Sequence, residues 1–107
     1  MLYTSENREI KTDAATGSAY WVARLDKLML TWFEVPPCTV FPAHSHESEQ
    51  ITYVLEGALF FEMDKQVYCL EAGDCISIPS NKQHKVWTAS TGAKAIDAWS
   101  PVNTHYQ

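Results

Sequence analysis

The chain has 107 residues, of which 46% are hydrophobic and 20% charged, a composition typical of one globular domain rather than of a disordered or fibrous chain. Its net charge of −5 argues against nucleic acid and anionic membranes as partners, because both repel a net anion. No apolar run approaches the ~20 residues of a membrane-spanning helix, and the first eight residues lack the pattern of a signal peptide. The three cysteines form no CxxC pair and suit free thiols in a reducing cytosol, so we expect a cytoplasmic protein.

The order of polar and apolar residues along the chain predicts an all-β domain. Residues 1–19 are mostly polar and are interpreted as an N-terminal arm or short edge strand, and residues 20–107 as the domain itself. From residue 20 onward, short runs rich in β-branched and aromatic residues alternate with turn signals such as Pro36-Pro37 and Gly73. We expect almost no helix, and strands arranged as a sandwich or barrel at residues 27–35, 38–41, 49–55, 58–63, 66–70, 75–78, 84–88 and 94–99.

Two of the four histidines have a spacing that suits a metal site. His44 and His46 lie two residues apart, so on an extended chain both side chains point to the same face. Gln50 has the same parity, and His84 opens a later strand after the turn at Pro79. Imidazole is the commonest protein metal ligand, although ordinary hydrogen-bonded histidines remain an alternative explanation. The pattern therefore indicates, without deciding, a metal site inside the sheet.

Two longer segments resemble the two motifs of the cupin superfamily. They are residues 38–57, CTVFPAHSHESEQITYVLEG, and residues 73–88, GDCISIPSNKQHKVWT, separated by a spacer of 15 residues. Cys38 and Asn81 stand where these motifs have glycine, so both turns must tolerate a side chain. The resemblance implies a double-stranded β-helix, the small jelly-roll barrel of RmlC-like cupins, with one metal site at its open end. It maps the metal ligands onto His44, His46, Gln50 and His84.

Gln50 stands where the resembled motif has a glutamate, which changes the charge of the site. Glu49 could replace it only if the register slipped by one residue, and Glu49 has the opposite parity to the histidines. Three imidazoles and an amide are neutral, so a divalent ion would keep its full charge, polarise a carbonyl strongly and favour an anionic ligand. The ligand types suit one divalent transition metal, Zn, Ni, Fe, Mn, Co or Cu. A pocket without metal remains an alternative.

The alternation of side chains along each strand predicts which residues line the pocket. Thr52 shares the face of Gln50, and Trp99 shares the face of Asp97. Asp97 lies between apolar neighbours, so it is either a general acid or base beside the pocket or a carboxylate with a hydrogen-bonding partner. Trp99 could line the pocket or belong to the core. Arg24 could bind a substrate carboxylate or pair with Asp26.

The end of the chain, IDAWSPVNTHY at residues 96–106, is similar to the ending of small cupins of the pectin-degradation type. That subgroup includes proteins that convert unsaturated uronates into their linear keto form. The resemblance implies that Asp97 and Trp99 line the active site, whereas the arginine of the subgroup falls on Asn103 here.

The function that we expect is a metal-dependent isomerisation or tautomerisation of a small oxygenated, anionic, sugar-acid-like metabolite. Asp97 would move the proton. The alternatives are a metal-dependent dioxygenase and a non-catalytic cupin that binds or senses a small ligand. Residues 58–61, ALFF, are apolar at every position, which indicates a strand covered on both faces, and we expect a homodimer.

Overall fold

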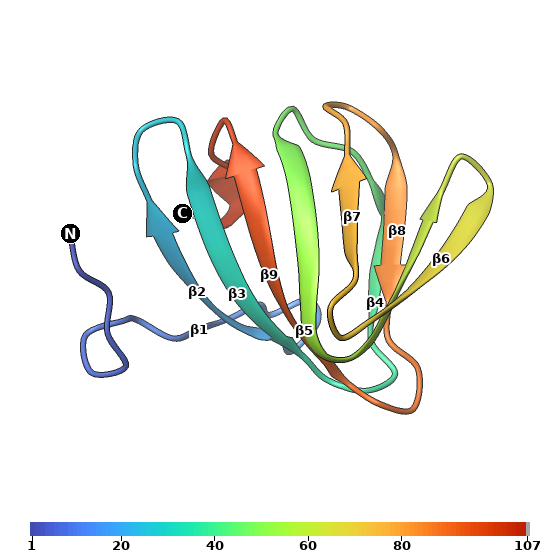
Figure 1. Ribbon diagram of the computed structural model, residues 1–107, viewed down its shortest axis with the longest axis horizontal. Coiled ribbons are helices and arrows are strands. Elements are labelled where there is room, and N and C mark those ends of the chain that lie inside the picture. The colour runs from blue at the N-terminus through green and yellow to red at the C-terminus, as the bar shows by residue number, and fades with distance from the viewer. Residues whose placement is uncertain (107) are drawn as a thin grey trace.

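The computed structural model describes residues 1–106, which form antiparallel strands and one short 3-10 helix (Figure 1). The expected all-β jelly-roll fold is confirmed, because the strands curl around a common interior. Within the described residues no helix is long and apolar enough to cross a membrane. The elements are β1 (Lys11–Thr12), β2 (Ala19–Arg24), β3 (Met29–Val35), β4 (Val40–His44), β5 (Glu49–Met63), β6 (Gln66–Glu71), β7 (Cys75–Ile78), β8 (His84–Trp87), β9 (Ala93–Ser100) and η1 (Thr104–Tyr106).

The long strand β5 joins the two layers of the barrel. Its first half pairs with β7 and β9 in the layer that continues through β3, β2 and β1, and its second half pairs with β6 and β8, beyond which lies β4. The sequence predicted two strands here, separated at Gly57. The chain instead continues through Gly57, which has a φ of 76° and lies where an added Cβ would collide with the carbonyl oxygen of Gly92. Glycine thus bends β5 between the layers without ending it.

The inward-facing side chains alternate along each strand. In β3 and β9 every second residue is buried, as expected for strands with one face on the core. The apolar core consists of Val54, Leu59, Phe61, Leu70, Ile78, Val86, Ala93 and Ala95. At one end of the barrel the same inward rows carry polar side chains instead, including Thr31, Thr52 and Asp97, all at most 7% exposed. This end, the upper end in Figure 1, is where β5 and β8 begin and β4 and β9 end.

Two strands differ from the sequence prediction for physical reasons. The sequence predicts no strand over Ala19–Arg24, yet β2 forms there because it pairs along its whole length with β3. The prediction also ended a strand before Pro42, whereas β4 continues to His44. Proline is tolerated because β4 lies at the edge of the sheet and the pairing with β8 is irregular between Phe41 and His44.

Candidate metal centre

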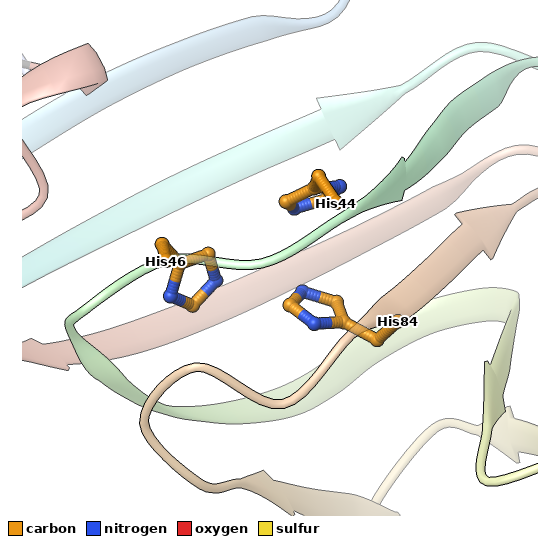
Figure 2. Close-up of side chains that lie close together, drawn as sticks. All are labelled: His44, His46 and His84. Atoms are coloured by element: carbon orange, nitrogen blue, oxygen red, sulfur yellow. The ribbon is translucent and has the colours of Figure 1, made fainter.

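Three histidines from different segments face one another at the polar end of the barrel (Figure 2). His44 ends β4 and pairs with His84, the first residue of β8, while His46 lies in the loop between β4 and β5. The ring centroids of His44 and His84 are 4.4 Å apart, and that of His46 lies 5.6 Å and 4.9 Å from them. One ring nitrogen of each residue lies within 4.8 Å of those of the other two, so the three could hold one metal ion.

The loops that carry His46 and His84 are tied together by hydrogen bonds. The backbone NH of Asn81 donates to the carbonyl of His46 at 2.8 Å, and the Ser80 hydroxyl donates to the carbonyl of Glu47 at 2.6 Å. Asn81 has a φ of 61°, in agreement with the expectation that it replaces glycine in this turn. The turn before β8 therefore holds the two imidazoles at a set separation.

The tautomer of each ring follows from its hydrogen bonds. In all three histidines Nδ1 lies within hydrogen-bond distance of a backbone carbonyl two residues away. A carbonyl only accepts, so each Nδ1 carries the proton and each Nε2 keeps its lone pair for a metal. The carbonyls belong to Pro42, Ser48 and Lys82, at 2.7, 2.8 and 2.8 Å respectively.

The Nε2 atom of His84 is buried without a partner. The residue is 2% exposed, and Nε2 finds no hydrogen-bond partner among the described residues. Burial lowers the pKa of His84 to about 4, so the ring is neutral near pH 7. A buried polar atom left unpaired costs about 1–3 kcal/mol, and a cation at the centre of the three rings would remove that cost.

Gln50 completes a set of four neutral donors. Its Oε1 lies 3.0 Å from Nε2 of His46. Both atoms carry lone pairs when Nδ1 of His46 holds the ring proton, so a shared cation would stabilise their approach. Two ligands of one ion at right angles, each about 2.1 Å from it, are about 3.0 Å apart. The residues present therefore fit a bound metal ion, and Glu49, on the other face of β5, is exposed.

Asp97 adjoins this donor set inside the protein. It is 7% exposed, and its carboxylate accepts hydrogen bonds from Thr52, from Thr31 at 3.3 Å and from Nε2 of Gln50 at 3.4 Å. Burial raises the pKa of Asp97 to about 6, and these three hydrogen bonds oppose the shift. The structure thus gives Asp97 the hydrogen-bonding partners that one expectation required, and the role of general acid or base stays a prediction, supported by the raised pKa.

A cavity of about 50 Å³ opens beside the donor set. Its polar lining residues are His44, Gln50, His84 and Asp97, and its apolar and aromatic ones are Phe33, Val35, Phe41, Leu59, Phe61, Val86, Ala95, Trp99 and Tyr106. Within the described part of the chain neither lysine nor arginine lines it. The anionic substrate expected from the sequence would therefore find positive charge only at a metal ion.

The other three predicted site residues lie at different distances from the cavity. Trp99 lines the cavity, and its ring meets that of His46 edge-on at 5.2 Å. Thr52, predicted to line the pocket, is instead buried at 1% exposure outside the cavity lining and contacts the site through hydrogen bonds to Gln50 and Asp97. Arg24 is not brought to the site: it ends β2 on the surface, where its Nε donates to the carbonyl of Leu25 at 3.3 Å.

Two residues of the site were missed by the sequence analysis. Thr31 lies opposite Asp97 in the β3–β9 ladder and accepts a hydrogen bond from Nε1 of Trp99 at 3.0 Å. Tyr106, in η1, supplies one wall of the cavity. The parity of Thr31 within its predicted strand was the available signal, but its partner lies 66 residues away.

The amino-acid sequence is similar to a known domain family and to a known protein. A family model described as "Cupin domain" matches residues 31–99. The chain is 33% identical over 81 residues to an acireductone dioxygenase from Heterostelium pallidum, an alignment that covers 63% of this chain and 54% of that protein. The chain thus spans about half the length of this relative.

Solved structures share the fold over nearly the whole chain. KdgF from Halomonas sp. matches with a TM-score of 0.88 and 23% identity, covering 100% of this chain and 98% of that one. An RmlC-like cupin from Shewanella frigidimarina matches with a TM-score of 0.88 and 25% identity, covering 98% and 94%. The polyketide cyclase RemF from Streptomyces resistomycificus matches with a TM-score of 0.81 and 21% identity, covering 97% and 81%.

Proposed function

The chain belongs to the cupin domain family, and we propose that it is an enzyme that isomerises or tautomerises a small oxygenated metabolite at a bound metal ion. The observation that carries this proposal is the unpartnered, buried Nε2 of His84. His84 faces two further imidazoles (Figure 2) and lines the same cavity as Asp97. A Lewis-acid site next to a buried proton carrier is what enolisation of a carbonyl compound requires.

In this mechanism His44, His46, Gln50 and His84 would hold the ion. A divalent transition metal, one of Zn, Ni, Fe, Mn, Co or Cu, would polarise the carbonyl group of the substrate. The carboxylate of Asp97 takes a proton from the carbon next to that carbonyl. The electron pair of the broken C–H bond forms a C=C bond, and the π electron pair of the carbonyl moves onto its oxygen. Asp97 then gives the proton to that oxygen, which yields the enol tautomer, or to the far end of a C=C bond conjugated with the new one, which moves the double bond. Neither route changes the oxidation state.

The neighbours of Asp97 position it for this transfer. Thr31 and Thr52 donate hydrogen bonds to its two oxygens from the strands on either side of β9. The hydroxyl of Thr31 is itself held by the indole NH of Trp99. These bonds hold the carboxylate beside Gln50, so the proton carrier and a metal ligand keep a constant separation.

The test combines metal analysis with proton exchange. We expect about one metal ion per chain in protein purified without nickel affinity chromatography, and its loss in His46→Ala. The metal-loaded protein should accelerate exchange of the C3 protons of 2-oxobutanoate with D₂O, followed by NMR. Asp97→Asn should slow this exchange about 100-fold, the lower range for a general base. Exchange that is equally fast in Asp97→Asn or without metal would contradict the proposal.

A metal-dependent dioxygenase is the second candidate, because the chain is 33% identical over 81 residues to a protein named acireductone dioxygenase. An oxygen electrode separates the two reactions, since only the dioxygenase consumes O₂ when the iron-loaded protein meets a chelating substrate. A binding or sensory cupin is the third candidate. It would bind a ligand equally well in wild type and Asp97→Asn and turn over neither.

We also propose a cytoplasmic homodimer that binds a small molecule. Ile51, Tyr53 and Leu55 on the outer face of β5 are 50%, 43% and 41% exposed, and a second copy would cover them. The three cysteines are free and exposed, which suits a reducing compartment. Sedimentation equilibrium of wild type and Tyr53→Lys tests the dimer, because a charge at this face should favour the monomer.

A further inference from the structure

The cavity beside the three histidines is polar at one end only. Its four polar lining residues are neighbours: Gln50 donates to Asp97 at 3.4 Å, and the rings of His44 and His84 are 4.4 Å apart. The rest of the lining is aliphatic or aromatic, and its polar atoms are the hydroxyl of Tyr106 and the indole NH of Trp99, which donates to Thr31. A molecule bound at the histidines would therefore have its chelating atoms at the polar end and its remaining atoms against apolar side chains.

Apart from the Nε2 atoms of the histidines, which face the proposed metal ion, the polar groups at that end already have partners. Both oxygens of Asp97 accept hydrogen bonds, and the amide nitrogen of Gln50 donates to Thr52 at 2.8 Å. Each histidine uses its Nδ1 on a backbone carbonyl. A ligand hydroxyl buried here would find few free partners, and each one left unpaired lowers affinity about tenfold or more. The cavity thus disfavours a ligand that carries several hydroxyl groups beyond its chelating atoms.

Charge also selects the ligand. The four neutral donors leave a divalent ion with its full charge, which favours a singly negative chelate formed by two oxygens. Lysine and arginine are absent from the lining formed by residues 1–106, so a second negative charge on the ligand would be buried without a counterion. The substrate should therefore carry its negative charge on the chelating oxygens.

The end of the chain closes the cavity with an aromatic ring. Asn103 caps η1, since its side-chain oxygen accepts from the NH of His105 at 3.0 Å and its carbonyl accepts from the NH of Tyr106 at 3.1 Å. This turn places the ring of Tyr106 5.1 Å from Phe33 and 5.6 Å from Trp99. Asn103, which stands where the resembled subgroup has an arginine, thus helps to build an aromatic wall here, whose one polar group is the hydroxyl of Tyr106.

We infer that the substrate is a singly negative oxygen chelator, of the 2-oxo acid or 1,3-diketone type, whose remaining body is short and apolar and enters this cavity. The inference rests on the proposed metal site and narrows the class of substrate, because a sugar acid would bury its hydroxyl groups against apolar side chains. The cavity volume of about 50 Å³ has room for roughly three to five atoms of the size of a water oxygen.

A chain-length series tests the inference by binding rather than by turnover. The protein is loaded with cobalt(II), and its absorption bands report the affinity for pyruvate, 2-oxobutanoate, 2-oxopentanoate and 4-methyl-2-oxopentanoate. We expect affinity to rise about fourfold with each buried methylene until the cavity is full. 2-Keto-D-gluconate should bind no more tightly than pyruvate. Pentane-2,4-dione distinguishes a preference for a diketone head from one for a 2-oxo acid head.

Matched variants locate the apolar body. Val86→Thr adds a hydroxyl to the cavity wall with little change in shape, so it should flatten the chain-length series while leaving pyruvate binding intact. Ala95→Ser makes a smaller change on the same wall and serves if Val86→Thr folds poorly. Val67→Thr is the control, because Val67 is 55% exposed on β6, outside the cavity, and should leave the series unchanged.

The outcomes separate this inference from the proposed function. A flat series in wild type, tighter binding of 2-keto-D-gluconate than of 2-oxopentanoate, or no binding of any of these chelators would overturn the inference while metal uptake stood. Failure to take up cobalt would overturn the proposed function and, with it, the chelating head assigned to the substrate. Binding with the expected length dependence but no proton exchange would keep the inference and refute the reaction.

Discussion

Replacing His84 by phenylalanine should separate the structural role of its ring from metal binding. The substitution keeps a planar ring in a site that is 2% exposed and removes the unpartnered Nε2. It also removes the Nδ1 donor to the carbonyl of Lys82, a bond of 2.8 Å at a partly exposed loop residue. The two losses act in opposite directions on the metal-free protein.

The expected free energies follow from these contacts. Relief of the buried unpaired Nε2 should stabilise the metal-free variant by about 1–3 kcal/mol, and loss of the hydrogen bond should destabilise it by about 0.5–1.5 kcal/mol. We therefore expect the free energy of unfolding without metal to lie between about 0.5 kcal/mol below and about 2.5 kcal/mol above that of wild type. An ion at 1,000 times its dissociation constant should stabilise wild type by about 4 kcal/mol, which the variant should largely lose.

Differential scanning calorimetry with and without zinc, after treatment with a chelator, measures both effects. For a chain of this size 1 kcal/mol corresponds to about 4 °C, so wild type should shift by about 15 °C with zinc and His84→Phe by only a few degrees. His105→Phe is the matched control, since His105 is exposed in η1 and should keep the full shift. A metal-free variant destabilised by several kcal/mol, or a zinc shift retained in His84→Phe, would refute the reasoning about Nε2.

Three further predictions concern the polar end of the barrel and its surroundings. Gln50→Glu puts a carboxylate about 3.4 Å from that of Asp97, and the two charges repel by about 5 kcal/mol at an effective dielectric constant of 20. Urea unfolding at about pH 8 should therefore show that the metal-free variant is less stable than wild type and that zinc restores its stability. The pKa of Asp97 is raised from 3.8 to about 6 in the folded protein, so this residue stabilises the metal-free fold below about pH 4. That stabilisation, about 3 kcal/mol in the free energy of unfolding, is lost as the pH rises through 6. Asp97→Asn should remove this part of the pH dependence, and an unchanged profile of stability against pH would contradict the shift. Arg24→Ala changes a surface residue, so the free energy of unfolding should change by less than about 0.5 kcal/mol and the affinity for 2-oxo acids should stay the same. Weaker binding of 2-oxo acids by this variant would show that Arg24 contributes to the site.

Local patterns were sufficient to predict much of this protein. Turn residues and runs of β-branched and aromatic side chains predicted an all-β chain, and the family match confirms the resemblance carried by the two motifs. The spacing of His44 and His46 placed two imidazoles on one face because side chains alternate along an extended chain. The neutral character of Gln50 could likewise be read directly, since it depends on residue type alone.

Only the tertiary structure decided which faces meet. Thr31 lies beside Asp97 because β3 and β9 are neighbours, a pairing across 66 residues that no local periodicity contains. Tyr106 reaches the cavity because η1 turns the end of the chain back over the barrel, and Arg24 stays outside because β2 ends at a surface turn. Side-chain alternation determines the face of a strand on which a residue lies, but the order of the strands in the sheet determines what that face contacts. The sequence by itself therefore predicted the candidate donors that the structure brings together, whereas the shape and lining of the cavity beside them came from long-range strand pairing.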